Sequence, residues 1–141
     1  MVVNMKIGVV GYSDDKCFDH DIARALLAIG LGIANRMHPD ENYELVSGLT
    51  NTGIPKLAYE MAKSLGWKII GLTAKEGKQY ECYPVDEEII VGEKFGDESE
   101  AFIKYIDVLV RVGGGNQSIK ETAMAKKANV PTYEYDLPRK K

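Results

Sequence analysis

The residues best suited to chemistry are three consecutive glycines that follow an apolar run. Residues 108–112 have the character of a buried strand, Gly113, Gly114 and Gly115 come next, and a helical pattern begins directly afterwards. Glycine leaves backbone N–H groups uncovered, so a ligand can approach the main chain closely. The start of the following helix adds unpaired N–H groups and the positive end of the helix dipole. The segment predicts a site for the phosphate of a nucleotide or another phosphorylated small molecule.

Polar residues continue this turn and add candidate contacts. We expect Asn116, Gln117 and Ser118 to join the glycines at the phosphate. Ser118-Ile-Lys-Glu121 also matches a capping box, in which the serine and glutamate side chains bond to the first amides of the helix. Glu121 would lie one turn inside a phosphate-seeking helix, so it is equally a candidate active-site carboxylate. The spacing of the glycines matches neither a P-loop nor the dinucleotide-binding fingerprint.

Two further turns follow predicted strands. Gly48-Leu-Thr50-Asn51-Thr-Gly53 leads into a helix, and its polar side chains would serve either as helix caps or as a second contact to an anion or a ribose. Gly11-Tyr-Ser13 follows the first strand and supplies either a third wall of the same site or a plain loop.

Other residues that could do chemistry have ordinary alternatives. Arg111 lies within an apolar strand, where a buried guanidinium pairs either with a neighbouring carboxylate or with a ligand phosphate. His20 and His38 have no companion at metal-ligand spacing, so we assign no metal site. Cys17 and Cys82 are expected to be free thiols. Tyr80 and Tyr83 would either stack on a base or simply pack.

Apolar patterns that alternate between strand and helix spacing surround these turns. Strands are expected at residues 6–11, 43–48, 68–74, 87–91, 108–112 and 130–135, and helices at 19–37, 54–65, 98–106 and 118–128. In the first helix, the stripe expected to face the core consists of Ile22, Leu26, Ile29, Ile33 and Met37. In the last helix, the expected inward residues are Ile119, Ala123 and Met124.

This alternation predicts one α/β domain over residues 1–141, a three-layer Rossmann-like fold. A mainly parallel sheet of five to six strands would carry helices on both faces. Ligands of such sheets bind beyond the carboxyl ends of the strands. The loops at residues 11–20, 48–53, 75–86 and 113–118 would therefore surround one crevice.

The composition and net charge of the chain disfavour nucleic acids and membranes as binding partners. The chain has 141 residues, 45% of them hydrophobic, and a net charge of −3. This balance disfavours a nucleic-acid-binding surface, and the apolar runs are too short to cross a membrane. The basic cluster Arg139-Lys-Lys141 is expected to be a solvated end. We expect a cytoplasmic protein whose partner is a phosphorylated small molecule.

Taken together, the turns resemble the Rossmann-like superfamily known as lysine decarboxylase-like. It includes the LONELY GUY phosphoribohydrolases and the molybdenum cofactor carrier proteins. The late motif of that superfamily reads Pro-Gly-Gly-x-Gly-Thr-x-x-Glu. Here Gly114, Gly115 and Glu121 match directly, Ser118 replaces threonine, and Gln117 replaces the last glycine. The resemblance implies that no cofactor is required, that a nucleotide or molybdopterin-type cofactor can be bound, and that the chain forms a homodimer or higher homo-oligomer.

One departure from the superfamily affects the expected reaction. The phosphoribohydrolases carry an arginine on the helix before the motif strand, whereas residues 98–106 contain none and Glu98 lies near that place. The chain also lacks the longer helical extensions of the hydrolases, so the carrier-like branch is the nearer match, and nothing supports lysine decarboxylation. Three hypotheses remain: a carrier of a phosphorylated nucleotide or pterin-type cofactor, an N-glycosidase acting on nucleoside monophosphates through Glu121, and a non-catalytic interaction module.

Overall fold

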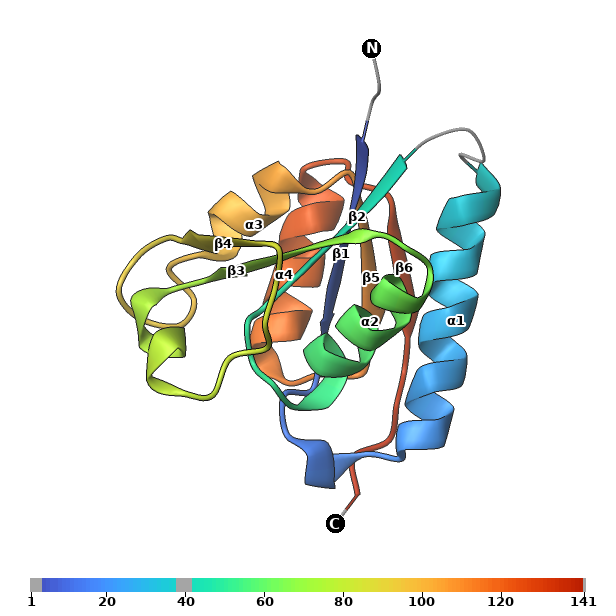
Figure 1. Cartoon of the computed structure of the whole chain (residues 1–141), viewed down its shortest axis with the longest axis horizontal. Helices are drawn as coiled ribbons and strands as arrows, with labels where there is room; N and C mark the ends of the chain where they lie inside the picture. The colour runs from blue at the N-terminus through green and yellow to red at the C-terminus, as the bar shows by residue number, and fades with distance from the viewer. Residues whose placement is uncertain (1–3, 38–41, 141) are drawn as a thin grey trace.

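The computed structural model describes residues 4–37 and 42–140, and within them the chain forms a three-layer α/β fold (Figure 1). The helix break expected at residues 38–42 falls mostly outside this part. Six strands of the described residues form one sheet in the order β4-β3-β2-β1-β5-β6, and every pairing is parallel. The Rossmann-like fold and the parallel sheet expected from the sequence are confirmed. The strands are β1 (Asn4–Gly11), β2 (Asn42–Ser47), β3 (Lys68–Thr73), β4 (Glu87–Ile90), β5 (Val108–Val112) and β6 (Thr132–Tyr135).

The helices divide between the two faces of the sheet (Figure 1). Helices α1 (His20–Met37) and α2 (Gly53–Ser64) cover one face, and α3 (Ser99–Tyr105) and α4 (Asn116–Lys127) cover the other. The strand order turns back where β1 lies beside β5, and these two strands end level because Gly11 pairs with Val112. A parallel sheet opens a ligand crevice at such a switch point. The first and last glycine turns of the sequence meet there.

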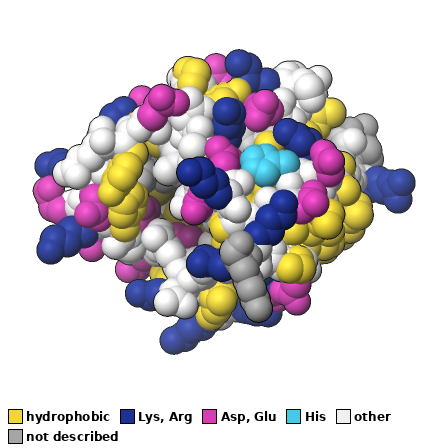
Figure 2. All heavy atoms as spheres, turned by 90° about the horizontal axis from the view of Figure 1, so that it is seen from below, with side chains coloured by type: hydrophobic (Ala, Val, Ile, Leu, Met, Phe, Trp, Pro, Cys, Tyr) yellow, Lys and Arg dark blue, Asp and Glu magenta, His cyan; other side chains and the backbone are white. Residues whose placement is uncertain are grey.

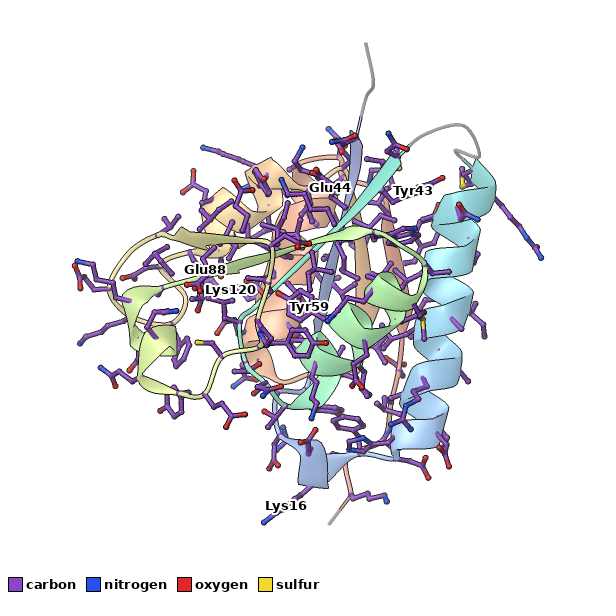
Figure 3. The ribbon with its side chains drawn as sticks, viewed as in Figure 1. Lys16, Tyr43, Glu44, Tyr59, Glu88 and Lys120 are labelled. Carbon is purple, nitrogen blue, oxygen red and sulfur yellow. The ribbon has the colours of Figure 1, made fainter. Side chains whose placement is uncertain are left out.

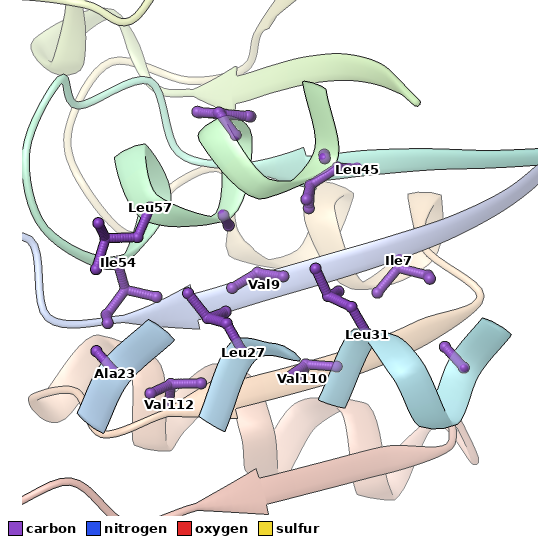
Figure 4. Packing of buried hydrophobic residues seen from close by; sticks show 14 of the residues in the cluster. Ile7, Val9, Ala23, Leu27, Leu31, Leu45, Ile54, Leu57, Val110 and Val112 are labelled. Carbon is purple, nitrogen blue, oxygen red and sulfur yellow. The ribbon is translucent and has the colours of Figure 1, made fainter. Parts of the chain in front are cut away.

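The side of α1 that faces the sheet differs from the prediction. The buried residues of the helix are Ala23, Leu27, Gly30, Leu31 and Ala34, as Figure 4 shows for three of them. The predicted stripe is wrong, because Ile22 and Ile29 are 49% and 50% exposed and Met37 is exposed as well. A side chain at Gly30 would bring its Cβ within 2.7 Å of Val110. The helix approaches the sheet so closely that the face with the smaller residues packs against it.

Helix α4 also turns a different face inward. It begins at Asn116, two residues before the predicted start, and no side chain caps it. The predicted capping box is therefore wrong: Ser118 Oγ lies 3.4 Å from the Gly11 carbonyl oxygen, and Glu121 accepts a hydrogen bond from Ser99. Ile119 and Ala123 are exposed, whereas Ser118, Glu121, Thr122 and Ala125 are buried. Hydrophobic periodicity failed here because the buried face of α4 consists mostly of hydrogen-bonded polar groups.

The loop expected at residues 75–86 folds back on the turn after β2. Within it, a short 3₁₀ helix, η2 (Lys75–Gln79), follows β3, and Thr50 then bridges to Cys82. The Asn51 amide donates to the Glu81 carbonyl at 3.1 Å, and the Tyr83 amide donates to the Leu49 carbonyl at 2.7 Å. The loop therefore fixes the outer side of the turn that forms part of the crevice.

Candidate functional site

A cavity of about 390 Å³ opens at the carboxyl ends of β1, β2, β3 and β5. Figure 2 views the molecule from this end, where basic and acidic side chains lie side by side. Four of the predicted site residues, Asn51, Gly53, Gly113 and Gly114, lie behind the wall of the cavity instead of lining it. The predicted site residues that line it are Gly11, Ser13, Gly48, Thr50, Gly115, Asn116, Gln117, Ser118 and Glu121.

The N-terminus of α4 opens into this cavity. Gly114 has φ of +107°, and a Cβ there would meet the Ser118 side chain at 2.5 Å, so only glycine lets the turn fold this tightly. Within residues 4–37 and 42–140, the amides of Asn116, Gln117 and Ser118 have no hydrogen-bond acceptor. These are the groups that an anion satisfies at a helix start, where the helix dipole also favours negative charge.

The N-terminus of α2 is closed by the loop after β1. The Gly53 amide donates to Asp15 Oδ1 at 2.6 Å, and the Ile54 amide donates to the Tyr12 carbonyl at 2.7 Å. Pro55 has no amide hydrogen to offer. The Asn51 side chain bonds to Glu81, on the outer side of the turn. The turn thus contributes Gly48 and Thr50 to the cavity wall, while the first amides of its helix are already bonded.

Two buried carboxylates line the cavity beside α4. Glu98 is 4% exposed and accepts hydrogen bonds from the amides of Ala74 at 3.2 Å and Gly96 at 2.7 Å. Glu121 is 6% exposed and accepts from Ser99 Oγ at 2.9 Å and from the Gln117 side chain. Burial raises the pKa of Glu121, and the Glu98 charge raises it further against the effect of these two hydrogen bonds. In the sequence, Glu98 stands out only because it lies near the position where the phosphoribohydrolases carry an arginine.

The C-terminal segment forms another part of the wall. Tyr12 donates from its hydroxyl to the Leu137 carbonyl at 2.9 Å, and the Lys140 amide donates to the Cys17 carbonyl at 2.6 Å. These contacts place the Arg139 guanidinium 5.2 Å from the centre of the Tyr12 ring, at the cavity. Arg139 is exposed, as expected of a solvated end, but the sequence did not predict that it also lines the cavity. No local motif signals this placement, because it depends on a contact between opposite ends of the chain.

Arg111 stabilises the glycine turn from behind. Its guanidinium bonds to Glu134 at 3.3 Å and to Asp136 at 2.8 Å, so the carboxylate partners expected as one alternative are present. It also donates to the Gly113 carbonyl at 2.9 Å. The side chain does not line the cavity, and it acts by fixing the turn that does.

The tyrosines considered as base contacts pack against other aromatic rings. Tyr83 stacks on Tyr59 with 5.1 Å between the ring centres. The ring centre of Tyr80 lies 6.0 Å from that of Phe95, which lines the cavity. Tyr59, labelled in Figure 3, is fully buried on α2 and donates from its hydroxyl to the Gly48 carbonyl at 2.7 Å. Burial raises the pKa of this hydroxyl. Tyr59 therefore fixes the turn after β2 from the core.

Two other kinds of site are absent from the described residues. No group of three or more His, Cys, Asp or Glu side chains in residues 4–37 and 42–140 is arranged to hold a metal ion. His20 stacks on Phe18 and bonds to the Asp15 carbonyl, while His38 lies outside the described part. Over the same stretches of chain, no helix is both long and apolar enough to cross a membrane.

Fold and site together define a Rossmann-like protein of the lysine decarboxylase-like and molybdenum cofactor carrier superfamily, as the sequence resemblance indicated. The model of the SLOG cluster4 family matches residues 4–137, and the chain belongs to that family. No curated protein matches it.

Several solved structures share the fold. The molybdenum cofactor carrier protein of Chlamydomonas reinhardtii is 25% identical with a TM-score of 0.72, over 94% of this chain and 76% of that one. The molybdenum cofactor binding protein of Rippkaea orientalis is 22% identical with a TM-score of 0.75, over 95% and 77%. The structural-genomics target TM1055 is 22% identical with a TM-score of 0.72, over 91% and 72%.

Proposed function

We propose that this protein binds a phosphorylated nucleotide or a nucleotide-like cofactor of the pterin type, and that it acts as a carrier. The observation that carries the proposal is the uncapped start of α4, whose free amides open into the cavity. Similarity to a molybdenum cofactor carrier protein at 25% identity supports the carrier role. Phosphate would bind to the amides of residues 116–118, with Ser118 and Arg139 beside them.

The residues present fit a ligand with a phosphate and a flat heterocycle. The cavity of about 390 Å³ lies in the range of roughly 300–1,000 Å³ that small-molecule sites occupy. Phe95 and Phe102 supply apolar surface for a ring, and Thr50 and Ser13 supply hydroxyl groups. A phosphorylated pterin would therefore find an anion site, an apolar wall and hydrogen-bonding groups in one crevice.

Two measurements test the proposal. Native mass spectrometry of the purified protein should show a retained phosphorylated compound, and inorganic phosphate, AMP and GMP should each raise the melting temperature. A ligand at a hundred times its Kd stabilises the folded state by about 2.7 kcal/mol. If no phosphorylated compound binds or shifts the melting curve, the protein is better described as an interaction module.

A second candidate function, N-glycosidase activity on nucleoside monophosphates, is favoured by one observation. The raised pKa of Glu121 suits a general acid that protonates a departing base, and a second carboxyl group, that of Glu98, lies in the same cavity. The test is chromatography of AMP incubated with the protein. Release of free adenine by the native protein and its loss in Glu121→Gln would select the enzyme, whereas bound but intact AMP would select the carrier.

We propose further that two copies of the chain associate through the exposed side of α1. Ile22, Ile29 and Met37 are exposed and spaced at helical intervals, with Leu26 and Ile33 half-buried between them. Asp21 lies in the first turn of the helix and Arg36 in the last. An antiparallel pair about a two-fold axis therefore brings opposite charges together at both ends of the apolar stripe. Ile29→Asp should convert the dimer to a monomer in light scattering, and unchanged mass would contradict this interface.

A further inference from the structure

Glu98 and Glu121 are two buried carboxyl groups that line one cavity. Both are buried, and neither is within ion-pair distance of a lysine or arginine of the described residues. Lys120 affects Glu121 least among the causes of its pKa shift, and its own side chain is exposed. Charged side chains are almost never fully buried without a partner, because the loss of water is costly. Within the described residues, each carboxyl group has two hydrogen-bond donors but no cation beside it, so a bound ligand can supply further N–H groups.

The pair lines the same cavity as the anion site but lies apart from it. Glu121 follows the first residue of α4 by five positions, which corresponds to about 7.5 Å along a helix at about 1.5 Å per residue. Glu98 lies at the start of α3, on the side of the cavity formed by β3 and by Phe102. A ligand with its phosphate on the α4 amides would therefore extend its other end towards the two carboxylates.

The two groups can accept further hydrogen bonds but cannot donate while ionised. A carboxylate has about four lone-pair sites, and the described contacts use two on Glu98 and two on Glu121. Two such carboxylates attract the N–H groups of a ligand, and they repel carbonyl oxygens and unprotonated ring nitrogens. The chemistry matches an amino group beside a ring N–H, which guanine and pterin share.

We propose that Glu98 and Glu121 select ligands whose heterocycle presents an amino group next to a ring N–H. The selection rests on the proposed function, since the phosphate must bind at α4 for the ring to reach the pair. The carboxylates discriminate between heterocycles by their hydrogen-bond donors, whereas the α4 amides bind the phosphate of any of these ligands.

Calorimetric titration with three nucleotides tests the selection. GMP carries the 2-amino group, IMP lacks it, and XMP has an oxygen in its place. GMP should bind about tenfold more tightly than IMP, the range expected for a two-point hydrogen-bonded base contact, and XMP should bind most weakly. Equal Kd values for the three nucleotides would overturn the selection while leaving phosphate binding intact.

Substitutions of Glu121 and Glu98 test whether these two residues cause the preference for GMP. Glu121→Gln is the first variant, because its partners Ser99 and Gln117 are side chains that can reorient around an amide. The ratio between the IMP and GMP Kd values should fall towards one, because GMP loses more affinity than IMP. Glu100→Gln is the matched control, since Glu100 is an exposed residue of α3 that pairs with Lys104. Its ratio should equal that of the native protein.

Glu98→Gln gives an independent second result. Both oxygens of Glu98 accept from backbone amides, so the variant's melting temperature and its shift with inorganic phosphate must first show that it is folded. A native ratio in both Glu121→Gln and Glu98→Gln would overturn the proposal. Absence of binding by all three nucleotides and by phosphate would overturn the proposed function together with it, an outcome distinct from equal affinities.

Discussion

The turns before α2 and before α4 occupy equivalent places in the fold but differ in how their helix amides are bonded. Each follows a buried strand and enters its helix through positive-φ glycine, Gly53 in the first turn and Gly113 and Gly114 in the second. In the first turn, Asp15 and the Tyr12 carbonyl accept from the first two amides of α2. In the second, the corresponding amides face the cavity without an acceptor in the described chain. Glycine content therefore does not distinguish an anion site from a structural turn, whereas the bonding of the helix amides does.

This difference has an energetic meaning. Bonded amides at α2 contribute to the stability of the folded chain, while free amides at α4 leave hydrogen-bonding capacity that a ligand can use. Changes at the first turn should lower stability, and changes at the second should lower affinity.

The largest expected effect is that of Gly53→Ala. Gly53 has φ of +70°, and a Cβ would lie 2.3 Å from the Tyr12 carbonyl oxygen, so backbone must move. We expect a loss of about 3 kcal/mol in the free energy of unfolding, measured by urea denaturation. Gly115→Ala is the matched control at the other turn, because its Cβ would meet nothing closer than Arg139 at 3.7 Å. It should keep its stability but bind phosphate more weakly; an equal loss of stability in both variants would refute the distinction.

Tyr59→Phe should have the next largest effect. The change leaves the Gly48 carbonyl, at the start of the first turn, without its buried donor. We expect a loss of about 2 kcal/mol in the same denaturation experiment. Tyr80→Phe provides the comparison, since Tyr80 is 58% exposed, and it should be near neutral.

Asp15→Ala should make the first turn resemble the second. Removing the acceptor of the Gly53 amide should cost about 1 kcal/mol, because the bond is only partly buried. Sulfate should then raise the melting temperature of this variant more than that of the native protein, as the freed amide gains an anion. An identical response to sulfate in both proteins would show that α2 cannot bind an anion even when opened.

The smallest expected effect is the pH dependence of stability contributed by Glu121. Its folded pKa is raised, so its contribution is present below the unfolded pKa of about 4.3 and is lost as pH rises through the folded pKa. Glu121→Gln should therefore gain in melting temperature relative to the native protein between pH 4 and pH 7. Glu100→Gln should show the opposite trend, and only below about pH 4.3, because the hydrogen bond from Lys104 lowers the pKa of Glu100. A gain that is constant with pH would argue against this titration.

The fold was accessible from sequence because buried parallel strands and amphipathic helices leave strong periodic patterns. The face of α1 that packs against the sheet was not predicted correctly. Hydrophobic periodicity favours the larger apolar residues, whereas the close approach of the helix at Gly30 requires smaller ones. The glycine turn at α4 was also visible. Arg139 was not, because it reaches the cavity only through the contacts of Leu137 and Lys140 with the loop after β1. Long-range hydrogen bonds of this kind have no local pattern.

Those contacts make the last described residues part of the crevice. Proteolysis after Asp136 would remove Arg139 from the wall and the acceptor of the Tyr12 hydroxyl, while the six paired strands would remain. Trimmed protein would thus retain a folded sheet and lose ligand affinity. For purification, an affinity tag belongs before β1, because that strand begins at the opposite side of the molecule (Figure 1).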